Sequence, residues 1–273
     1  CEAPCRITCP AHMNIPLMNR LLAAGAYREA LKVVKQDIAL PGVFGYVCPA
    51  PCEGACHRKS IDAPVAICLL KRFAGEHELE GAGEWYPEIP PSSGKRVAVI
   101  GAGAAGIAAA YYLRGNGHEI TVLDRREAPG GKLLDEVEKG NLPARVLEYE
   151  TGILSKMGVE FQLNTRVDAA RFSDLQQHYD AILVAHGKET GATEAADTIS
   201  KNDSAANEDF PIDAAALDRQ TYRIGNTHMF VAGSALKHSR MAIRAHGQGK
   251  EAAIAIHQFL SGATVTGQPA GFN

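Results

Sequence analysis

All seven cysteines of this 273-residue chain lie between Cys1 and Cys68, and residues 69–273 contain none. They form two closely spaced groups and one isolated residue, namely Cys1, Cys5 and Cys9, then Cys48, Cys52 and Cys56, then Cys68. Prolines within and beside these groups prevent either one from forming a continuous regular helix. A disulfide framework requires an oxidising compartment, and an odd number of cysteines leaves one thiol over. The crowding therefore indicates a metal site.

The cysteine spacing also bears on the kind of metal. Iron–sulfur clusters take four thiolates each, and closely spaced cysteine runs often divide their ligands between two clusters. Zinc sites usually show Cys-x2-Cys knuckles or a mixture of Cys and His. This sequence has no such knuckle, and His12 and His57 lack a paired spacing. Iron–sulfur clusters are favoured, with zinc or simply buried cysteines as the alternatives.

Charge and hydropathy limit the partners of the chain. Lys and Arg number 28 against 31 Asp and Glu, a net charge of -3, which gives no argument for a nucleic acid or a membrane surface as partner. No apolar run approaches the roughly 20 residues of a membrane span. The first residues do not resemble a signal peptide. We expect a soluble, cytoplasmic protein.

The first 80 residues predict a small all-helical domain. Asn14 is placed to cap a helix that ends at Gly25, a second helix covers residues 27–36, and a third runs from near Pro64 to about Glu76. Residues 81–94 are rich in Gly, Pro and Ser and predict a linker.

Residues 95–273 predict an α/β domain of the Rossmann type. Strands are expected at residues 96–100, 120–123, 159–161, 181–184 and 229–231, with helices at 104–114 and 239–260. The alternation of strand and helix favours a parallel sheet. Residues 190–209 are polar without periodicity and predict a surface loop.

A Gly-x-Gly-x-x-Gly motif, Gly101, Gly103 and Gly106, lies directly between a predicted strand and helix. Gly101 permits the tight turn, Gly103 lets the backbone approach a pyrophosphate, and Gly106 allows close helix–strand packing. Asp124 ends the next strand, where an acid accepts hydrogen bonds from ribose hydroxyls. The motif predicts a dinucleotide site rather than a purely structural turn.

Three later segments resemble flavoproteins with two dinucleotide folds. Residues 129–133, Pro-Gly-Gly-Lys-Leu, resemble their second Gly pair, and residues 230–234 resemble the segment that meets the flavin. Ser234 stands where those proteins have Asp, and His186 replaces Thr in an Ala-Thr-Gly turn. The resemblance implies FAD as the cofactor.

Motif and resemblance together imply a set of FAD-binding residues. His186 either acts on the flavin or is a substitution that affects packing alone. His238, Arg240 and Arg244 could bind the flavin phosphates or a partner, or could simply form a solvated face. The implied set is Gly101, Gly103, Ala104, Ala105, Gly106, Asp124, Arg125, Gly130, Gly131, Lys132, Leu133, Val167, Ala185, His186, Gly187, Gly233, Ser234, Met241 and Ala242.

The first 75 residues resemble the double-cluster domain of the glutamate synthase small subunit and of dihydropyrimidine dehydrogenase. The most specific signature is Val-Cys-Pro-Ala-Pro-Cys-Glu-Gly-Ala-Cys at residues 47–56. The resemblance implies two [4Fe-4S] clusters with crossed ligation. One would be held by Cys1, Cys5 and Cys56, and the other by Cys9, Cys48 and Cys52.

Two departures from that family affect the ligands. The family's first cysteine has no counterpart before Cys1, so we expect a missing preceding segment that leaves the fourth ligand of the first cluster unassigned. The family completes its second cluster with Gln or Glu, where this chain has Lys71, a poor ligand. Cys68 lies on the same helical face, three residues earlier. We predict Cys68 as the replacement ligand, the alternative being a buried helical cysteine.

The family's full-length members carry a second dinucleotide-binding unit, for NAD(P)H, before the closing segment. Here residues 188–227 stand in its place without a second glycine motif, so we expect that unit to be absent. The resemblance then implies a FAD-dependent oxidoreductase subunit that passes electrons between FAD, its own clusters and partner redox subunits. The alternatives are an enzyme in which NAD(P)H docks directly on FAD, and a redox-silent assembly subunit. No catalytic acid–base residue is identified.

Overall fold

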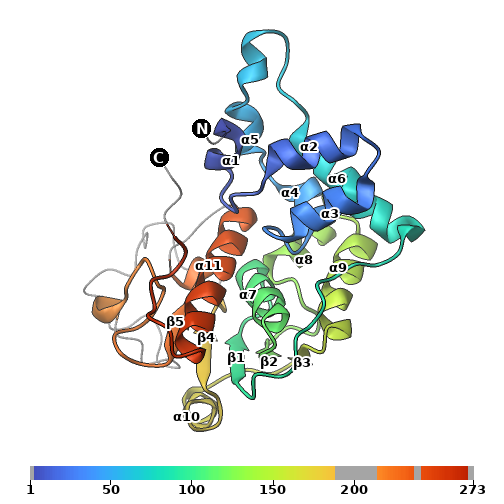
Figure 1. The fold of residues 1–273 in the computed structure, drawn as a ribbon. Helices are drawn as coiled ribbons and strands as arrows, with labels where there is room; N and C mark the ends of the chain where they lie inside the picture. Colours follow the sequence, from blue (N-terminus) through green and yellow to red (C-terminus); the bar gives the residue numbers. More distant parts are fainter. Residues whose placement is uncertain (1–2, 188–213, 237–240, 270–273) are drawn as a thin grey trace.

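A computed structural model describes residues 3–187, 214–236 and 241–269 of the chain (Figure 1). A bundle of short helices comes first along the chain, and an α/β unit follows it. The predicted fold class, a helical iron–sulfur domain followed by a Rossmann-like domain with a parallel sheet, is confirmed by the element order and by the family matches reported below. The predicted surface loop at residues 190–209 lies outside the described residues.

The helical part consists of short segments with distinct starts. Its elements are α1 (Pro4–Thr8), α2 (Ile15–Ala23), α3 (Tyr27–Lys35), α4 (Pro41–Val47), α5 (Pro51–Gly54), η1 (His57–Ser60), α6 (Ile67–His77) and η2 (Glu78–Ala82). The side chain of Asn14 accepts a hydrogen bond from the backbone N–H of Leu17, so the predicted cap of α2 is present. The prediction that the third helix begins near Pro64 is wrong, because α6 begins at Ile67.

The backbone breaks at the cysteines, as their prolines predict. Cys9 and Cys48 are extended residues that end α1 and α4, and Ala50 adopts the left-handed conformation just before α5. Of the described cysteines in these two groups, Cys5 and Cys52 lie within helical turns, in α1 and α5. Each cysteine group is therefore spread over a bend, which lets its thiols point in different directions.

The α/β part contains a five-stranded parallel sheet in the order β3-β2-β1-β4-β5. The strands are β1 (Arg96–Ile100), β2 (Glu119–Leu123), β3 (Glu160–Gln162), β4 (Ala181–Val184) and β5 (Met229–Val231). The third strand therefore begins one residue later than predicted. The carboxyl ends of β1, β2 and β4 meet at one edge, since Ile100 lies opposite both Leu123 and Val184.

Helices cover the sheet, and one pair of them packs with little separation. They are α7 (Ala104–Gly115), α8 (Lys132–Glu138), α9 (Ala144–Lys156), α10 (Ala169–His178) and α11 (Ala242–Leu260), with short turns η3 (Ala214–Ala216) and η4 (Gly233–Ala235). A Cβ at Gly249 of α11 would lie 2.0 Å from the carbonyl oxygen of Ala105 in α7, so only glycine fits there. The predicted terminal helix starts later than expected among the described residues, at Ala242. Across these residues, no helix has the length and apolar character that crossing a bilayer requires.

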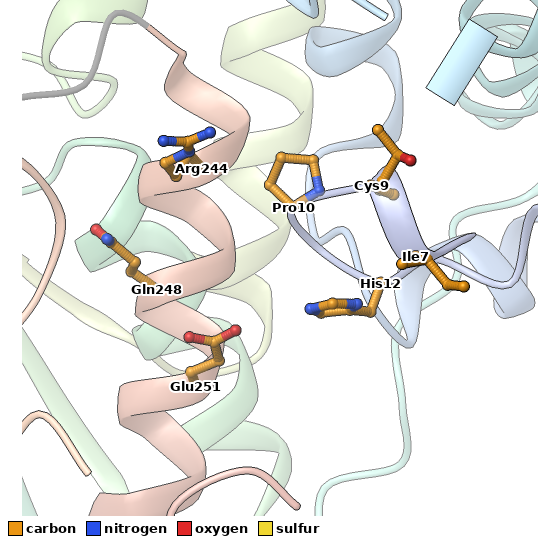
Figure 2. Close-up of a pocket in the computed structure, with 8 residues that line it drawn as sticks. Ile7, Cys9, Pro10, His12, Arg244, Gln248 and Glu251 are labelled. Carbon is orange, nitrogen blue, oxygen red and sulfur yellow. The ribbon is translucent and has the colours of Figure 1, made fainter. Parts of the chain in front are cut away.

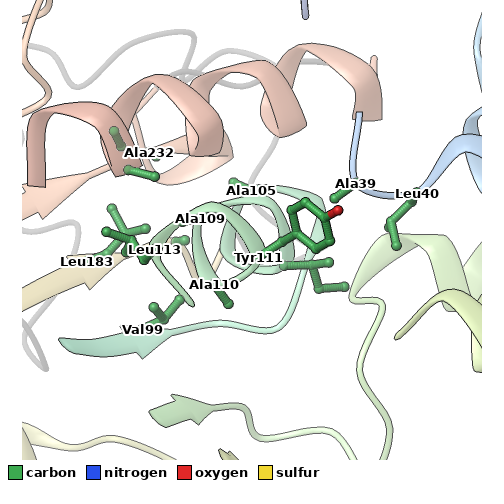
Figure 3. Close-up of a cluster of buried hydrophobic side chains, with 14 of the residues drawn as sticks. Ala39, Leu40, Val99, Ala105, Ala109, Ala110, Tyr111, Leu113, Leu183 and Ala232 are labelled. Carbon is green, nitrogen blue, oxygen red and sulfur yellow. The ribbon is translucent and has the colours of Figure 1, made fainter. Parts of the chain in front are cut away.

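The helical part and the α/β part share one hydrophobic core. Ala39 and Leu40, which precede α4, lie beside Tyr111 of α7 (Figure 3). Polar contacts join the same two parts, because Lys250 of α11 forms an ion pair with Asp37 at 2.6 Å. The region expected as a linker is also anchored at the buried Lys35–Glu78 ion pair. The N–H of Trp85 donates to Glu78 at 2.6 Å, and the carbonyl oxygen of Trp85 accepts from Lys35 at 2.7 Å. The two parts are therefore held in a defined relative position.

Candidate functional site

The glycine motif forms the turn between β1 and α7. Gly101 has a φ of +111°, and a Cβ on it would lie 2.6 Å from the carbonyl oxygen of Ala185. A Cβ on Gly106 would lie 1.8 Å from the carbonyl oxygen of Gly101. Gly103 differs, because a Cβ there would have no neighbour within 4 Å. Gly101 and Gly106 are therefore required by the fold, whereas Gly103 borders free space at the start of α7.

The start of α7 is suited to an anion. Its N-cap residue is Gly103, so no side chain caps the first backbone N–H groups of this 12-residue helix. Uncapped N–H groups and the helix dipole together favour a negatively charged group. The free space beside Gly103 lies at this helix end, which is the arrangement that a pyrophosphate needs.

Asp124, predicted to contact a ribose, lies directly beside the turn. Its Oδ2 accepts a hydrogen bond from the N–H of Ala102 at 2.6 Å, and its Oδ1 accepts one from the N–H of Arg126 at 2.8 Å. The carboxylate is half-buried and connects the ends of β1 and β2. Each oxygen keeps a further lone pair for a ligand hydroxyl. Arg125, the next residue, is exposed.

The second Gly pair packs against the first turn. The N–H of Gly130 donates to the carbonyl oxygen of Ala102 at 2.8 Å, and a Cβ on Gly131 would lie 2.8 Å from the Cα of Gly103. Both glycines have positive φ. Lys132 is exposed and Leu133 is buried. The two Gly motifs, 24 or more residues apart, thus form one continuous backbone surface.

The remaining predicted flavin residues lie in loops near the carboxyl ends of the strands. Ala185 is buried, and its N–H donates to the carbonyl oxygen of Ile100, while His186 is exposed. Gly233 packs against Ala105, because a Cβ there would lie 2.8 Å from that methyl group. The other positions are Ala104 and Ala105 in the first turn of α7, Val167 in the loop after β3, Gly187 after β4, Ser234 in η4, and Met241 and Ala242 at the start of α11.

Four cysteines from three separate segments come together in the helical part. We call Cys9, Cys48, Cys52 and Cys68 the inner cysteine set. The Cys68 thiol shares hydrogen bonds with Cys48 and Cys52, and Cys9 interacts electrostatically with Cys52. The hydrogen bond with Cys68 raises the pKa of Cys48 and lowers that of Cys52, while burial opposes the ionisation of both. Cys9, Cys52 and Cys68 are each less than 9% exposed.

Cys5 and Cys56 form a second, more open group, which we call the outer cysteine pair. Both are half-buried, and their charges interact with each other. Burial raises the pKa of Cys5, whereas a hydrogen bond from the backbone N–H of Val65 lowers the pKa of Cys56. Cys1, the third predicted ligand of this group, lies outside the described residues.

The six described cysteines are free thiols. Within the described ranges, no three His, Cys, Asp or Glu side chains are grouped closely enough to hold a single metal ion. A [4Fe-4S] cluster does not require such a group, because its four thiolates each bind a different iron and so lie farther apart than the ligands of one ion.

Two charged side chains adjoin the inner cysteine set. Lys71 is 3% exposed, and its Nζ lies 3.9 Å from the Sγ of Cys68. Glu53 Oε1 accepts a hydrogen bond from the backbone N–H of Cys68 at 2.8 Å, which fixes the first turn of α6. The family resemblance identifies Lys71 only as a poor ligand. The sequence gives no indication of Glu53, because its contact depends on the bend between α5 and α6.

A cleft of about 290 Å³ separates the loop after Cys9 from α11 (Figure 2). Pro10 and His12 line one side, and Arg244, Gln248 and Glu251 line the other. Arg244 is exposed and lines this cleft. The cleft therefore lies between the inner cysteine set and the last helix of the α/β part.

Comparison with known proteins identifies both parts of the chain. Residues 1–82 match the family model described as dihydropyrimidine dehydrogenase domain II, 4Fe-4S cluster. Residues 99–165 match the model described as NAD(P)-binding Rossmann-like domain. The iron–sulfur identity of the helical part and the dinucleotide fold of the rest agree with the order seen in the structure.

The homologues are subunits of oxidoreductases. The chain is 37% identical to the beta subunit of NADP(+)-dependent formate dehydrogenase from Moorella thermoacetica over 207 residues, 68% of this chain and 29% of that protein. It is 31% identical to the glutamate synthase [NADPH] small chain of Bacillus subtilis, over 80% of this chain and 44% of that one. It is 32% identical to the PreT subunit of the NAD-dependent dihydropyrimidine dehydrogenase of Escherichia coli, over 70% of this chain and 47% of that one.

These homologues confirm the resemblance to glutamate synthase small chains and dihydropyrimidine dehydrogenases. The chain spans less than half the length of each of the three relatives. Its kinship with oxidoreductase subunits therefore applies to the shared iron–sulfur and Rossmann-like parts.

Proposed function

We propose that this chain is the flavin and iron–sulfur electron-transfer part of a multi-subunit oxidoreductase. FAD exchanges electrons in pairs and iron–sulfur clusters exchange them singly, so the two cofactors together connect a two-electron donor to one-electron carriers. The chain's own residues bind these cofactors, hold them at a fixed separation and shield them from water. The observation that carries the proposal is the convergence of four thiols in a helical bundle that shares one core with the α/β part, which contains the glycine turn.

The residues of the inner cysteine set fit a [4Fe-4S] cluster. Four thiols meet, none of them is in a disulfide, and three are buried, which excludes solvent from an oxygen-sensitive group. We assign Cys9, Cys48, Cys52 and Cys68 as its ligands. The outer cysteine pair, with Cys1, would supply three ligands of a second cluster, in keeping with the family match of residues 1–82.

The turn around Gly103 fits the pyrophosphate of FAD. The uncapped start of α7 supplies N–H donors, the space beside Gly103 admits the phosphates, and Asp124 is placed to accept from a ribose. The loops that contain Gly130, His186 and Ser234 line the same edge of the sheet, and we assign the flavin to that edge.

A nicotinamide nucleotide on the same turn is the second candidate. It is favoured by the family match of residues 99–165, which is described as NAD(P)-binding. In that case the chain would bind NAD(P)H directly and pass its electrons to the clusters or to a partner subunit.

Anaerobic purification followed by assays of iron, acid-labile sulfide, zinc and extracted flavin tests the proposal. We expect about one FAD per chain and iron with an equal amount of sulfide. Stoichiometric zinc without iron would contradict the cluster assignment. A chain that retains iron but no flavin, and that binds NADH or NADPH tightly, would support the nicotinamide alternative.

Electron transfer itself is tested by anaerobic stopped-flow spectroscopy. When the partner's substrate is added as the electron donor to the assembly with its partner subunit, we expect the flavin absorbance to bleach and the cluster absorbance to follow. Fast bleaching of the isolated chain by NADH or NADPH would instead identify a free-standing NAD(P)H-dependent flavoenzyme.

A further inference from the structure

Lys71 differs from the other buried lysines of the described residues in what it faces. The Nζ of Lys35 lies 2.7 Å from Glu78, and the Nζ of Lys250 lies 2.6 Å from Asp37. Lys71 is equally buried, but no carboxylate of the described residues lies within ion-pair distance of it. A buried charge is costly unless a group of opposite charge compensates it. The groups beside Lys71 must therefore supply that compensation.

Those groups are the thiols of the inner cysteine set. The Nζ of Lys71 lies 3.9 Å from the Sγ of Cys68, and its charge also interacts with Cys48 and Cys52. In each case the positive charge favours the thiolate. The inner cysteine set therefore compensates the positive charge of Lys71 only when its cysteines are thiolates. The thiolate is also the form of cysteine that binds iron.

Among the residues that the structure describes, the outer cysteine pair has no comparable cation in a buried position. The groups that act on Cys56 are Arg58 and backbone N–H groups, and Arg58 is exposed and paired with Asp62. Cys5 interacts with Cys9 and Cys56. The inner cysteine set and the outer cysteine pair therefore differ in local charge.

We infer that Lys71 raises the reduction potential of the cluster held by the inner cysteine set above that of the cluster at the outer pair. This inference rests on the proposed function, since it requires the clusters. Reduction adds one electron and one negative charge to the cluster. A positive charge a few ångströms away in a water-excluded site stabilises that reduced form, because little solvent screens the attraction. Electrons that enter the chain would then collect at the inner cluster.

Redox potentiometry monitored by electron paramagnetic resonance tests the inference. Lys71→Met removes the charge and keeps most of the side-chain length, and Lys71→Arg keeps the charge. In Lys71→Met we expect one cluster signal to require a lower potential, with at least a tenfold change in its oxidised-to-reduced ratio at a fixed potential. A tenfold change corresponds to about 59 mV for one electron. The second cluster signal should not move, and Lys71→Arg should resemble the unmodified protein.

Lys59→Met is the matched control, because Lys59 is an exposed lysine near the outer pair. It should shift neither potential by a comparable amount. Unchanged potentials in Lys71→Met with full iron content would overturn the inference. Lys71→Ala serves as a second neutral variant. If both neutral variants fold by circular dichroism but lose half of the iron, Lys71 has a structural role and the inference is also wrong. Absence of iron from the unmodified protein would instead refute the proposed function.

Discussion

Glu150 of α9 accepts a hydrogen bond from the backbone N–H of Gly42 at 2.7 Å, across the boundary between the α/β part and the helical part. Its other oxygen accepts from the N–H of Val43 at 2.9 Å. One buried carboxylate thus satisfies two N–H groups in the first turn of α4, the helix that leads to Cys48. The position of a predicted cluster ligand is thereby connected to the dinucleotide-binding part.

The first prediction concerns the pH dependence of stability that Glu150 causes. Burial raises the pKa of Glu150 from 4.5 to about 7, and the charge of Glu78 adds to this rise. The hydrogen bonds from Val43 and Gly42 and the charge of Lys35 act in the opposite direction. Between pH 4.5 and 7 the folded state therefore binds more protons at this site than the unfolded state does. This contribution to stability is present below pH 4.5 and is lost as the pH rises through 7. The rise in pKa from 4.5 to about 7 corresponds to about 3 kcal/mol of unfolding free energy, at about 1.4 kcal/mol per pKa unit.

Chemical denaturation of Glu150→Gln at a series of pH values checks this prediction. The variant should lose the decline in free energy of unfolding between pH 4.5 and 7, because Gln does not titrate. Glu148→Gln, an exposed position on the same helix, is the control and should keep the decline. An identical pH profile for Glu150→Gln and the unmodified protein would show that Glu150 titrates normally.

The second prediction assigns Cys68 as a cluster ligand. Cys68→Ala should remove about half of the iron and spare the other cluster, because only the inner set loses a thiolate. Lys71→Ala should keep the full iron content. The family resemblance, which implies Gln or Glu at the position of Lys71, adds a rescue: the double variant Cys68→Ala, Lys71→Gln should regain part of the lost iron.

Iron and sulfide assays with electron paramagnetic resonance measure these outcomes. Cys56→Ala serves as the matched variant for the outer pair and should abolish the other signal. Full iron content in Cys68→Ala would mean that Cys68 is a buried helical cysteine without a ligand role.

The third prediction concerns Gly103. A Cβ at this position meets no atom within 4 Å, so Gly103→Val should fold with a loss of about 1 kcal/mol, the typical effect of a poor N-cap residue. The branched side chain would nevertheless occupy the space assigned to the pyrophosphate. We therefore expect a normal thermal unfolding profile and at least a tenfold loss of flavin affinity.

Flavin content and fluorescence titration with FAD provide the measurement. Gly152→Ala on α9 is the control, because a Cβ there also meets no neighbour, and it should keep its flavin. Full flavin occupancy in Gly103→Val would place the cofactor elsewhere. Gly101→Val, by contrast, should fail to fold, since its φ of +111° and the nearby carbonyl of Ala185 exclude a side chain.

The fourth prediction concerns His246, which is buried in α11 and accepts a hydrogen bond from the backbone N–H of Ala39 at 3.0 Å. Burial lowers its pKa to about 3 from 6.5, and the charges of Lys250 and Lys71 lower it further. The unfolded state therefore binds more protons here than the folded state between pH 3 and 6.5. Stability from this residue is present above pH 6.5 and is lost as the pH falls towards 3.

Two variants separate the hydrogen bond of His246 from its titration. His246→Gln retains an acceptor and should reduce the loss of stability below pH 6.5. His246→Leu leaves the N–H of Ala39 unsatisfied and should cost about 1–3 kcal/mol at pH 7. Equal stability of the two variants at pH 7 would show that the hydrogen bond to Ala39 contributes nothing measurable.

The features that could be predicted from the sequence are those produced by residues close together in the chain. Asn14 caps α2 three residues away, and Gly101, Gly103 and Gly106 form a turn whose geometry depends on five neighbouring peptide units. The hydrophobic runs that become β1, β2 and β4 are likewise local. Such patterns predict structure because propensity, capping and periodicity act over a few residues.

The tertiary structure alone decided the contacts that join distant segments. Glu150 and Gly42 are 108 residues apart, and His246 and Ala39 are 207 apart, so no spacing rule relates them. The same holds for Lys71, whose sequence position marks it only as an unsuitable ligand. Lys71 is buried against thiols, and no carboxylate of the described part of the chain forms an ion pair with it. This follows from the packing of α6 beside the cysteine loops, because the charge that a buried lysine faces depends on which segments fold around it.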